Sequence, residues 1–172
     1  MLNPMPRRGH RMRGCIETMA NGIENTDFPG LNGRLLVVYD GHCGFCNRSI
    51  RWFLVRDLHD RLRFAPSESP MVAALLNRHG INALAPNTIL VVESAAEYAG
   101  SSQERVFSRS SAVIALLEQL GAPWPFAAVL LKLIPSPIRN LGYTVVARLR
   151  YRIAGRFETC PLPTAEERRH FL

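Results

Sequence analysis

The sequence predicts an α/β protein with a mixed sheet of about four strands, flanking helices and a C-terminal helical extension. Three observations support this class. Strand-like and helix-like segments alternate in the first half, two strand-like runs then follow each other directly, and further helical patterns continue after residue 121. With 172 residues and 47% hydrophobic content, the chain can form one domain with a substantial core.

The first strand and helix follow from the most apolar part of the N-terminal half. Residues 34–40, RLLVVYD, are a continuous apolar run, which is typical of a strand buried on both faces. Residues 41–57 favour a helix because their apolar side chains recur with helical spacing. The side chains that share this face are Cys46, Ile50, Phe53 and Leu54.

The next elements are read in the same way. Residues 61–67 predict a second strand, and 69–80 a helix with a serine cap, a proline at its first position and a final glycine. Residues 87–94 and 104–110 predict two more strands, joined by a turn at the intervening residues as an antiparallel hairpin. Residues 108–121 then form a helix that begins at serine and ends at glycine.

The order strand, helix, strand, helix, strand, strand, helix defines the predicted topology. Alternation in the first half implies parallel crossovers, and the second half adds a hairpin and a covering helix. This arrangement is a thioredoxin-like core. We expect residues 1–33 to be a disordered or loosely attached leader, 34–121 to be the core, and 122–172 to be a helical extension packed on it.

The extension contains two predicted helices, separated by the prolines at 135 and 137. Leu141, Val145, Leu149 and Ile153 recur every four residues, and no acidic residue occurs between Glu118 and Glu158. We expect this apolar stripe to cover the core. The alternative is that residues 124–156 associate weakly with an anionic membrane surface. The most apolar window, residues 126–134, is too short to span a bilayer.

Charge and cysteine content restrict the function classes. The net charge is +7, but no nucleic-acid-binding motif occurs, so we predict no nucleic-acid partner. Four cysteines are too few for a disulfide scaffold of this length, and the N-terminus lacks the apolar stretch of a secretory signal. We therefore predict a cytoplasmic protein, in which a Cys-x-x-Cys pair is redox-active or binds metal.

The sequence CGFC at 43–46 is the main candidate site. It lies between a predicted strand and a predicted helix, so Cys43 falls at the helix N-terminus and Cys46 one turn later. Unpaired backbone N–H groups and the helix dipole favour a thiolate at Cys43. We predict that Cys43 attacks a substrate disulfide and that Cys46, on the inner face and less exposed, resolves the mixed disulfide. Arg48 can add positive charge if it folds back.

Asp40 is the third candidate, three residues before Cys43. Its carboxylate can accept a proton from the resolving thiol, directly or through water. The alternative is that it shapes the turn or caps the helix. Thioredoxins place a cis-proline immediately before the third strand, opposite the active site. Pro86 lies near that place but one position out of register, and the sequence leaves its isomer open.

The segment YDGHCGFCNRSIRWFLVRD resembles the signature of the DCC family of predicted thiol-disulfide oxidoreductases, named for an Asp-x-x-Cys-x-x-Cys pattern. Asp40, Cys43 and Cys46 match that pattern, and the resemblance continues in RLRFAPSES and YRIAGRFETCPLP, so that it spans roughly residues 34–172. It implies a thioredoxin-like fold and a protein-disulfide oxidoreductase activity. We predict exchange with a disulfide-containing protein or small-thiol substrate and no cofactor, and the sequence does not identify the electron donor.

Two alternatives remain open at this point. Zinc would need two more ligands beside the Cys-x-x-Cys pair, and the candidates are unpaired in sequence: Cys15, Cys160, His42 and His59. Cys160 is interpreted as a buried structural cysteine, or else as a third exchanging thiol. Beside the thiol-disulfide oxidoreductase, a second function class thus remains open: a thioredoxin-like binding module with a metal-binding or peripheral membrane accessory role.

Overall fold

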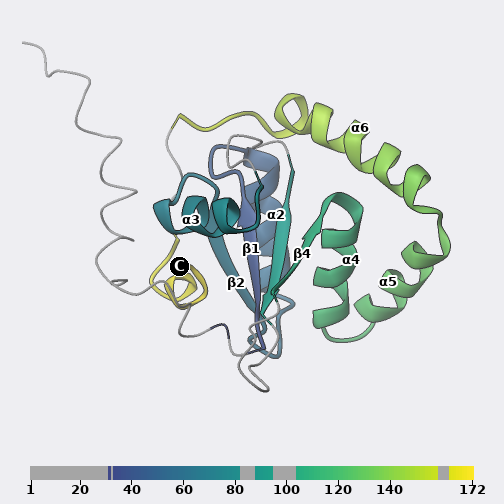
Figure 1. The fold of residues 1–172 in the computed structure, drawn as a ribbon, viewed down its shortest axis with the longest axis horizontal. Coiled ribbons are helices and arrows are strands. Elements are labelled where there is room, and N and C mark those ends of the chain that lie inside the picture. Colours follow the sequence, from purple (N-terminus) through teal and green to yellow (C-terminus); the bar gives the residue numbers. More distant parts are fainter. Residues whose placement is uncertain (1–30, 32, 82–87, 95–103, 159–162) are drawn as a thin grey trace, which may run out of the picture.

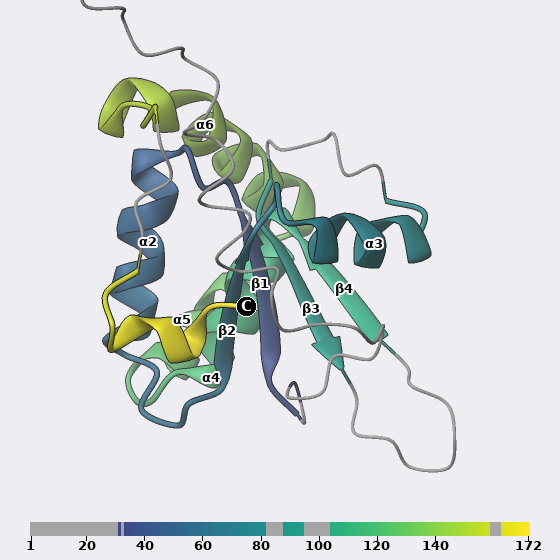
Figure 2. The ribbon, with the colours of Figure 1, turned by 90° about the vertical axis from the view of Figure 1, so that its left-hand side faces the viewer.

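The computed structural model describes residues 31, 33–81, 88–94, 104–158 and 163–172. Within them, a four-stranded sheet is flanked by helices on both faces (Figures 1 and 2). The elements are β1 (Leu35–Tyr39), α2 (Gly44–Leu54), β2 (Leu62–Pro66), α3 (Pro70–Arg78), β3 (Leu90–Ser94), β4 (Glu104–Ser108), α4 (Arg109–Gln119), α5 (Trp124–Leu133), α6 (Ser136–Ala154) and the 3-10 helix η1 (Glu167–His170).

The strand order is β2-β1-β3-β4. β1 pairs with β2 in parallel, with Leu35 opposite Leu62, and pairs antiparallel with β3, where Leu35 lies opposite Glu93. β3 and β4 form an antiparallel pair. The predicted mixed sheet, its parallel crossover and its hairpin are confirmed, and the topology is the thioredoxin-like one. The predicted hairpin turn, Pro86, Cys15 and Cys160 lie outside the described residues.

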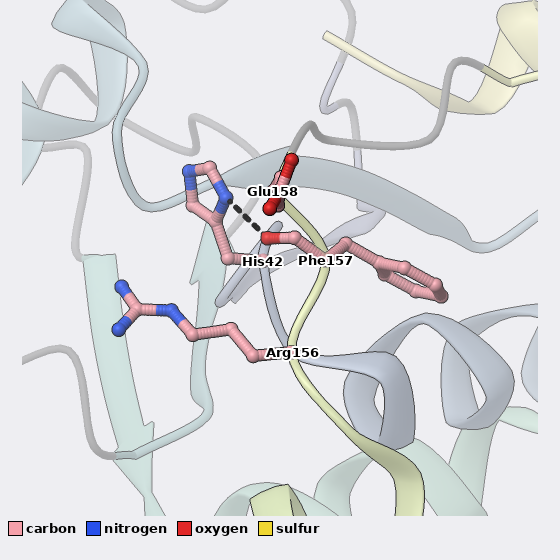
Figure 3. A pocket seen from close by; sticks show the side chains of 4 residues that line it. All are labelled: His42, Arg156, Phe157 and Glu158. Carbon is pink, nitrogen blue, oxygen red and sulfur yellow. Dashed lines mark hydrogen bonds between the residues drawn. The ribbon is translucent and has the colours of Figure 1, made fainter.

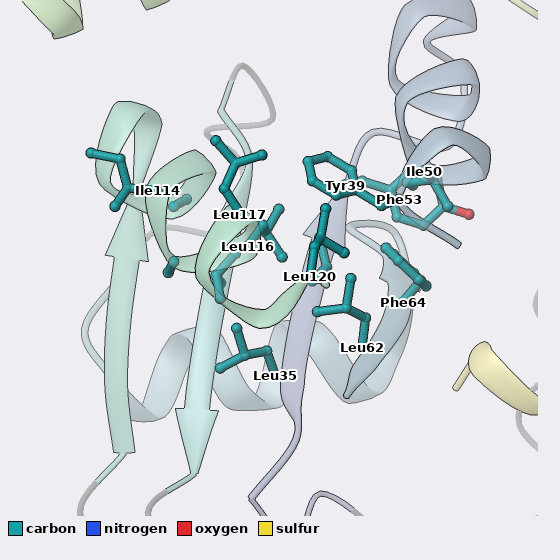
Figure 4. Packing of buried hydrophobic residues seen from close by; sticks show 14 of the residues in the cluster. Leu35, Tyr39, Ile50, Phe53, Leu62, Phe64, Ile114, Leu116, Leu117 and Leu120 are labelled. Atoms are coloured by element: carbon teal, nitrogen blue, oxygen red, sulfur yellow. The ribbon is translucent and has the colours of Figure 1, made fainter. Parts of the chain in front are cut away.

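The sheet separates two apolar clusters because alternate residues of a strand face opposite sides. On one side Leu35, Val37 and Tyr39 pack against α2, α4 and α5 (Figure 4). On the other side Leu36 and Val38 pack against α3. Burial of all five β1 residues confirms the strand predicted from the apolar run. Leu31, from the segment that we assigned to the leader, is also buried in the second cluster.

The C-terminal residues return to the far edge of the sheet. The backbone N–H of Leu172 donates to the Phe64 carbonyl at 2.9 Å, and Phe171 packs against Tyr39 and Phe64. Asp60 anchors this region. Its carboxylate accepts hydrogen bonds from Arg34 and Arg63 at 2.8 Å and lies 3.3 Å from His170.

The arginine contacts predict an acid-sensitive element of stability. Hydrogen bonding to Arg63, opposed by partial burial, lowers the pKa of Asp60 to about 2, and the charges of Arg63 and Arg34 contribute. A depressed carboxyl pKa adds stability above the unfolded value near 4, and this is lost as the pH falls toward 2. We expect Asp60→Asn to remove that part of the acid-unfolding curve. Asparagine tolerates the positive φ of 54° at this position.

The measurement is the free energy of unfolding in urea between pH 2 and 7, for the wild type and Asp60→Asn. Glu68→Gln, a neutralised carboxyl elsewhere on the chain, serves as the control. The curves of wild type and Asp60→Asn should differ most at neutral pH and converge near pH 2. A constant difference across the whole range would contradict this expectation.

The C-terminal extension packs on the core through an unexpected face. Residues 140, 143, 147, 150 and 154 of α6 point inward and are half-buried or buried, whereas the apolar stripe predicted to cover the core is exposed. The Ser110 hydroxyl donates to the Asn140 side chain at 2.6 Å, and the Ile89 N–H donates to the Tyr143 hydroxyl at 2.8 Å. The prediction for the stripe was therefore wrong, because α6 docks by polar contacts.

No helix in the described part of the chain is both long enough and apolar enough to cross a membrane.

Candidate active site

Cys43 is the N-cap of α2, directly after the turn that follows β1. Its backbone is extended (φ −84°, ψ 115°), and α2 begins at the next residue. The Cys43 Sγ accepts a hydrogen bond from the backbone N–H of Cys46 at 3.2 Å. A first-turn N–H thus points at the sulfur, as the predicted strand–turn–helix arrangement requires. Both cysteines are free thiols.

Asp40 connects the turn to the C-terminal extension. One carboxylate oxygen accepts the His42 N–H at 3.0 Å, which fixes the turn before Cys43. The other accepts a hydrogen bond from Arg150 at 3.1 Å and one from the Tyr151 hydroxyl. The turn-shaping alternative for Asp40 is therefore present in the structure, and the same carboxylate also holds two residues of α6.

Arg150 brings a buried positive charge to the two sulfurs. Its side chain is about 5% exposed, and it forms an ion pair with the equally buried Asp40. The guanidinium also donates to the Cys46 Sγ at 3.7 Å and to the Tyr151 hydroxyl at 3.0 Å. Arg48, which can add positive charge only if it folds back, is exposed on α2.

The surroundings of Cys46 favour its protonated form. Burial raises the pKa of the Cys46 thiol, and the hydrogen bond and charge of Cys43 raise it further, against a lowering effect of Arg150. Burial and the hydrogen bond to Asp40 likewise raise the pKa of Tyr151. The pair is thus asymmetric, with a helix N–H directed at Cys43 and a proton retained on Cys46.

Exposure of the two cysteines is the reverse of our prediction. Cys43 is completely buried, whereas Cys46 is partly exposed. Residues 155–157, which we call the strap, lie directly over this part of the turn, with Arg156 bridged to Cys43. The Gly44 N–H donates to the Gly155 carbonyl at 3.2 Å, and the Phe157 N–H donates to the His42 carbonyl at 2.8 Å, so the strap runs antiparallel beside the turn. Sequence reasoning missed this cover because it comes from a distant segment.

An open pocket of about 430 Å³ lies where the strap meets the turn, and His42, Arg156, Phe157 and Glu158 line it (Figure 3). The His42 Nδ1 lies 3.2 Å from the Phe157 carbonyl oxygen. His42 therefore contacts the strap as well as preceding Cys43. The lining therefore combines a positive side chain, Arg156, and a negative one, Glu158, with the residue that precedes Cys43.

The metal alternative can be compared with the described residues. Among them, the group that combines three potential ligand side chains is Asp57, Asp60 and His170, and neither cysteine belongs to it. The Asp57 carboxylate already accepts the N–H groups of Arg61 and Leu62 at 2.9 and 2.8 Å. Because Asp60 is held by two arginines, we interpret this group as a structural charge cluster.

Arg150 and Tyr151 are the site residues that sequence reasoning missed. Arg150 lies 104 residues from Cys46 and sits in a run that also contains Arg148 and Arg152. A signal was nevertheless present. The signal is the helical spacing of one set of residues: Asn140, Tyr143, Ala147, Arg150 and Ala154. In the structure this side of α6 is the one that packs on the core.

Comparison with known proteins agrees with the geometry. Uncharacterized protein YuxK of Bacillus subtilis is 26% identical over 137 residues, which cover 80% of this chain and 93% of the relative. The DCC family protein At1g52590, chloroplastic, of Arabidopsis thaliana is 27% identical over 139 residues, covering 81% and 76%. No solved structure matches significantly. A family model described as DCC1-like thiol-disulfide oxidoreductase matches residues 37–156, a segment that begins in β1 and ends in the strap. Arg150, the two cysteines and the first two residues of the strap thus fall within one matched unit, and the chain belongs to the DCC1-like thiol-disulfide oxidoreductase family.

Proposed function

We propose that this protein exchanges its Cys43–Cys46 dithiol with the disulfide of a protein or small-molecule substrate. The observation that carries the proposal is the hydrogen bond from the Cys46 N–H to the Cys43 Sγ at the start of α2, beside a buried guanidinium. A helix N-terminus and a nearby cation both stabilise a thiolate. Cys43 acts as the nucleophile and Cys46 as the resolving thiol.

The reaction has two steps. The Cys43 thiolate attacks one sulfur of the substrate disulfide, so that a Cys43–substrate bond forms and the other substrate sulfur leaves as a thiolate, which takes up a proton. Cys46 then gives up its proton and attacks the Cys43 sulfur. This forms the Cys43–Cys46 disulfide and releases the second substrate thiol. A dithiol reductant must supply two electrons to restore the starting state.

We assign Asp40 and Arg150 as positioning residues. Both Asp40 oxygens already accept hydrogen bonds, and one of them holds the Arg150 guanidinium toward Cys46. In that place the cation stabilises the Cys46 thiolate that forms in the second step. Asp40 therefore acts through Arg150. This differs from the role considered from the sequence, in which the Asp40 carboxylate accepts the proton of the resolving thiol.

The strap sets a condition on the first step. Because Cys43 is fully buried and the strap is paired beside it, we assign the opening that a substrate sulfur needs to movement of the strap. Only two backbone hydrogen bonds between described residues, from Gly44 and Phe157, tie the strap to the turn, and Arg156 and Phe157 are exposed. We therefore place substrate entry at the pocket beside His42. A reducing compartment such as the cytosol suits this chemistry, since it keeps the pair as free thiols.

The test is a covalent trap. Cys46→Ser leaves the first step intact and removes the second, so a mixed disulfide on Cys43 should accumulate. Incubation with oxidised glutathione or insulin, followed by mass spectrometry without reductant, should show the adduct on Cys46→Ser at several times the wild-type level. Cys43→Ser should form no stable adduct through this route and should lose turnover in an insulin-reduction assay.

Two results would contradict the proposal. Adducts that form on Cys46 when both cysteines are present would exchange the two roles. Stoichiometric zinc in the purified protein that is lost when either cysteine is replaced would assign the pair to metal binding.

The control for a general effect of substitution is Arg148→Met, at an exposed position of α6. This variant should turn over like the wild type.

A further inference from the structure

α5 presents an apolar face to solvent. Ala128 is buried against the core, and Trp124 and Leu131 are partly buried. The opposite side holds large apolar side chains at positions i, i+3, i+4 and i+7, all exposed, with Leu133 at 75%. The exposed residues are Phe126, Val129, Leu130 and Leu133.

Exposed apolar side chains continue around the turn after α5 and along α6. Ile134 and Ile138, on either side of the turn, are exposed. An apolar stripe then follows the full length of α6 on its outward side, because its inward side is the polar face that docks on the core. The stripe consists of Ile138, Leu141, Val145, Leu149 and Ile153. Figure 1 shows the α5–α6 turn at the opposite end of the molecule from the C-terminal residue.

The charges around this surface have one sign. No aspartate or glutamate occurs in residues 119–157, which contain six lysines and arginines. Lys132 pairs with Glu118, and Arg150 faces the cysteines, but Arg148, Arg152 and Arg156 are exposed. Arg148 and Arg152 lie beside the stripe, one turn of α6 apart. The exposed apolar side chains of α5 and α6, together with Arg148 and Arg152 beside them, make up the surface that we call the α5–α6 face.

The charge pattern selects among possible occupants of the α5–α6 face. A second copy of the chain would meet the same residues across a two-fold axis, so its arginines would oppose arginines, with no acidic residue of the face to pair with them. A nucleic acid would satisfy the charges but not the exposed leucines and isoleucines. A bilayer surface with anionic headgroups satisfies both, since the apolar stripe enters the acyl boundary and the arginines meet the headgroups.

We propose that the α5–α6 face binds the surface of anionic membranes, with α6 lying in the interfacial plane. The stripe extends to Ile153, one residue before the end of α6, and the strap over Cys43 begins directly after that helix. Binding in this orientation places the thiol pair near the membrane surface. This proposal is independent of the exchange chemistry, because it concerns side chains on the opposite face of α6 from Arg150.

The experiment measures co-sedimentation of the full chain with vesicles of phosphatidylcholine alone or with 30% phosphatidylserine. We expect binding to the anionic vesicles to be at least about tenfold stronger and to fall at high salt. Leu133→Glu combined with Leu141→Glu should reduce it at least about tenfold. Arg148→Ala combined with Arg152→Ala should reduce it by about fivefold for each arginine.

The matched control is Val55→Glu combined with Leu58→Glu, two exposed apolar residues outside the α5–α6 face. It carries the same added charge and should bind like the wild type. Thermal melting of each variant verifies folding. Vesicle binding that survives in the leucine variant would assign binding to another segment, such as the arginines near the N-terminus, and would overturn the proposal. So would a dimer, seen by light scattering, that this variant dissociates.

Discussion

Replacing Arg150 with methionine is expected to destabilise the fold by about 3–5 kcal/mol, because it leaves the buried Asp40 carboxylate without its ion-pair partner. Methionine fills much of the same volume, so the loss reports the charge more than a cavity. Urea denaturation measures the change. Arg148→Met, on the exposed side of the same helix, should stay within about 0.5 kcal/mol of the wild type.

A second substitution separates the ion pair from other effects of the change. Asp40→Asn removes the carboxylate charge, so Asp40→Asn combined with Arg150→Met should be more stable than Arg150→Met alone. A buried pair behaves in this way because an unpaired charge costs more than an absent pair. Strict additivity of the two single variants would contradict the pairing.

Arg150→Met also tests the role of Arg150 as a positioning residue in disulfide exchange. Arg150 lowers the pKa of Cys46, so its removal should raise that pKa further and slow the step in which Cys46 resolves the mixed disulfide. The pH dependence of that step should move to higher pH. Arg150→Lys, which keeps the charge but loses the planar fork, should restore the pH profile more than the stability. A merely structural residue would change the stability without moving the profile.

Local patterns predicted the part of the fold whose determinants are local. β1 is an apolar run buried on both faces, and α2 has its apolar residues on one side, so each could be read from a few consecutive residues. The placement of Cys43 at the start of α2 followed from the same reading. Both inferences hold because burial and helical spacing act over short stretches of chain.

The parts that could not be predicted depend on contacts between distant segments. The stripe of α6 has the spacing of a core face, yet the surface on which α6 lies offers the Asp40 carboxylate, the Ser110 hydroxyl and the Ile89 N–H. These buried groups require hydrogen-bond partners, and the polar side of α6 supplies them. Hydrogen bonding of these groups stabilises the packed helix more than burial of the apolar stripe would, so α6 turns its apolar side outward.

At Gly44, between the two cysteines, the backbone at the end of α6 lies close to the start of α2. A Cβ on Gly44 would lie 2.2 Å from the Ala154 carbonyl oxygen and 3.2 Å from that of Gly155. Both are backbone atoms, which cannot rotate away as a side chain does. The glycine therefore permits the end of α6 and the strap to lie directly on the start of α2.

Gly44→Ala is accordingly expected to push the end of α6 and the strap away from α2. Alanine favours a helix by up to about 1 kcal/mol, but overpacking against backbone should outweigh this and destabilise the protein by about 1–3 kcal/mol. Because the strap lies over Cys43, iodoacetamide should label Cys43 faster than in the wild type, as peptide mass spectrometry can measure.

Gly142→Ala is the matched control, because its Cβ meets nothing within 4 Å in the middle of α6. It should stabilise the protein by about 0.5–1 kcal/mol and leave Cys43 labelling slow. Equal behaviour of the two alanine variants would mean that the strap does not rest on Gly44, and the cover over Cys43 would need another explanation.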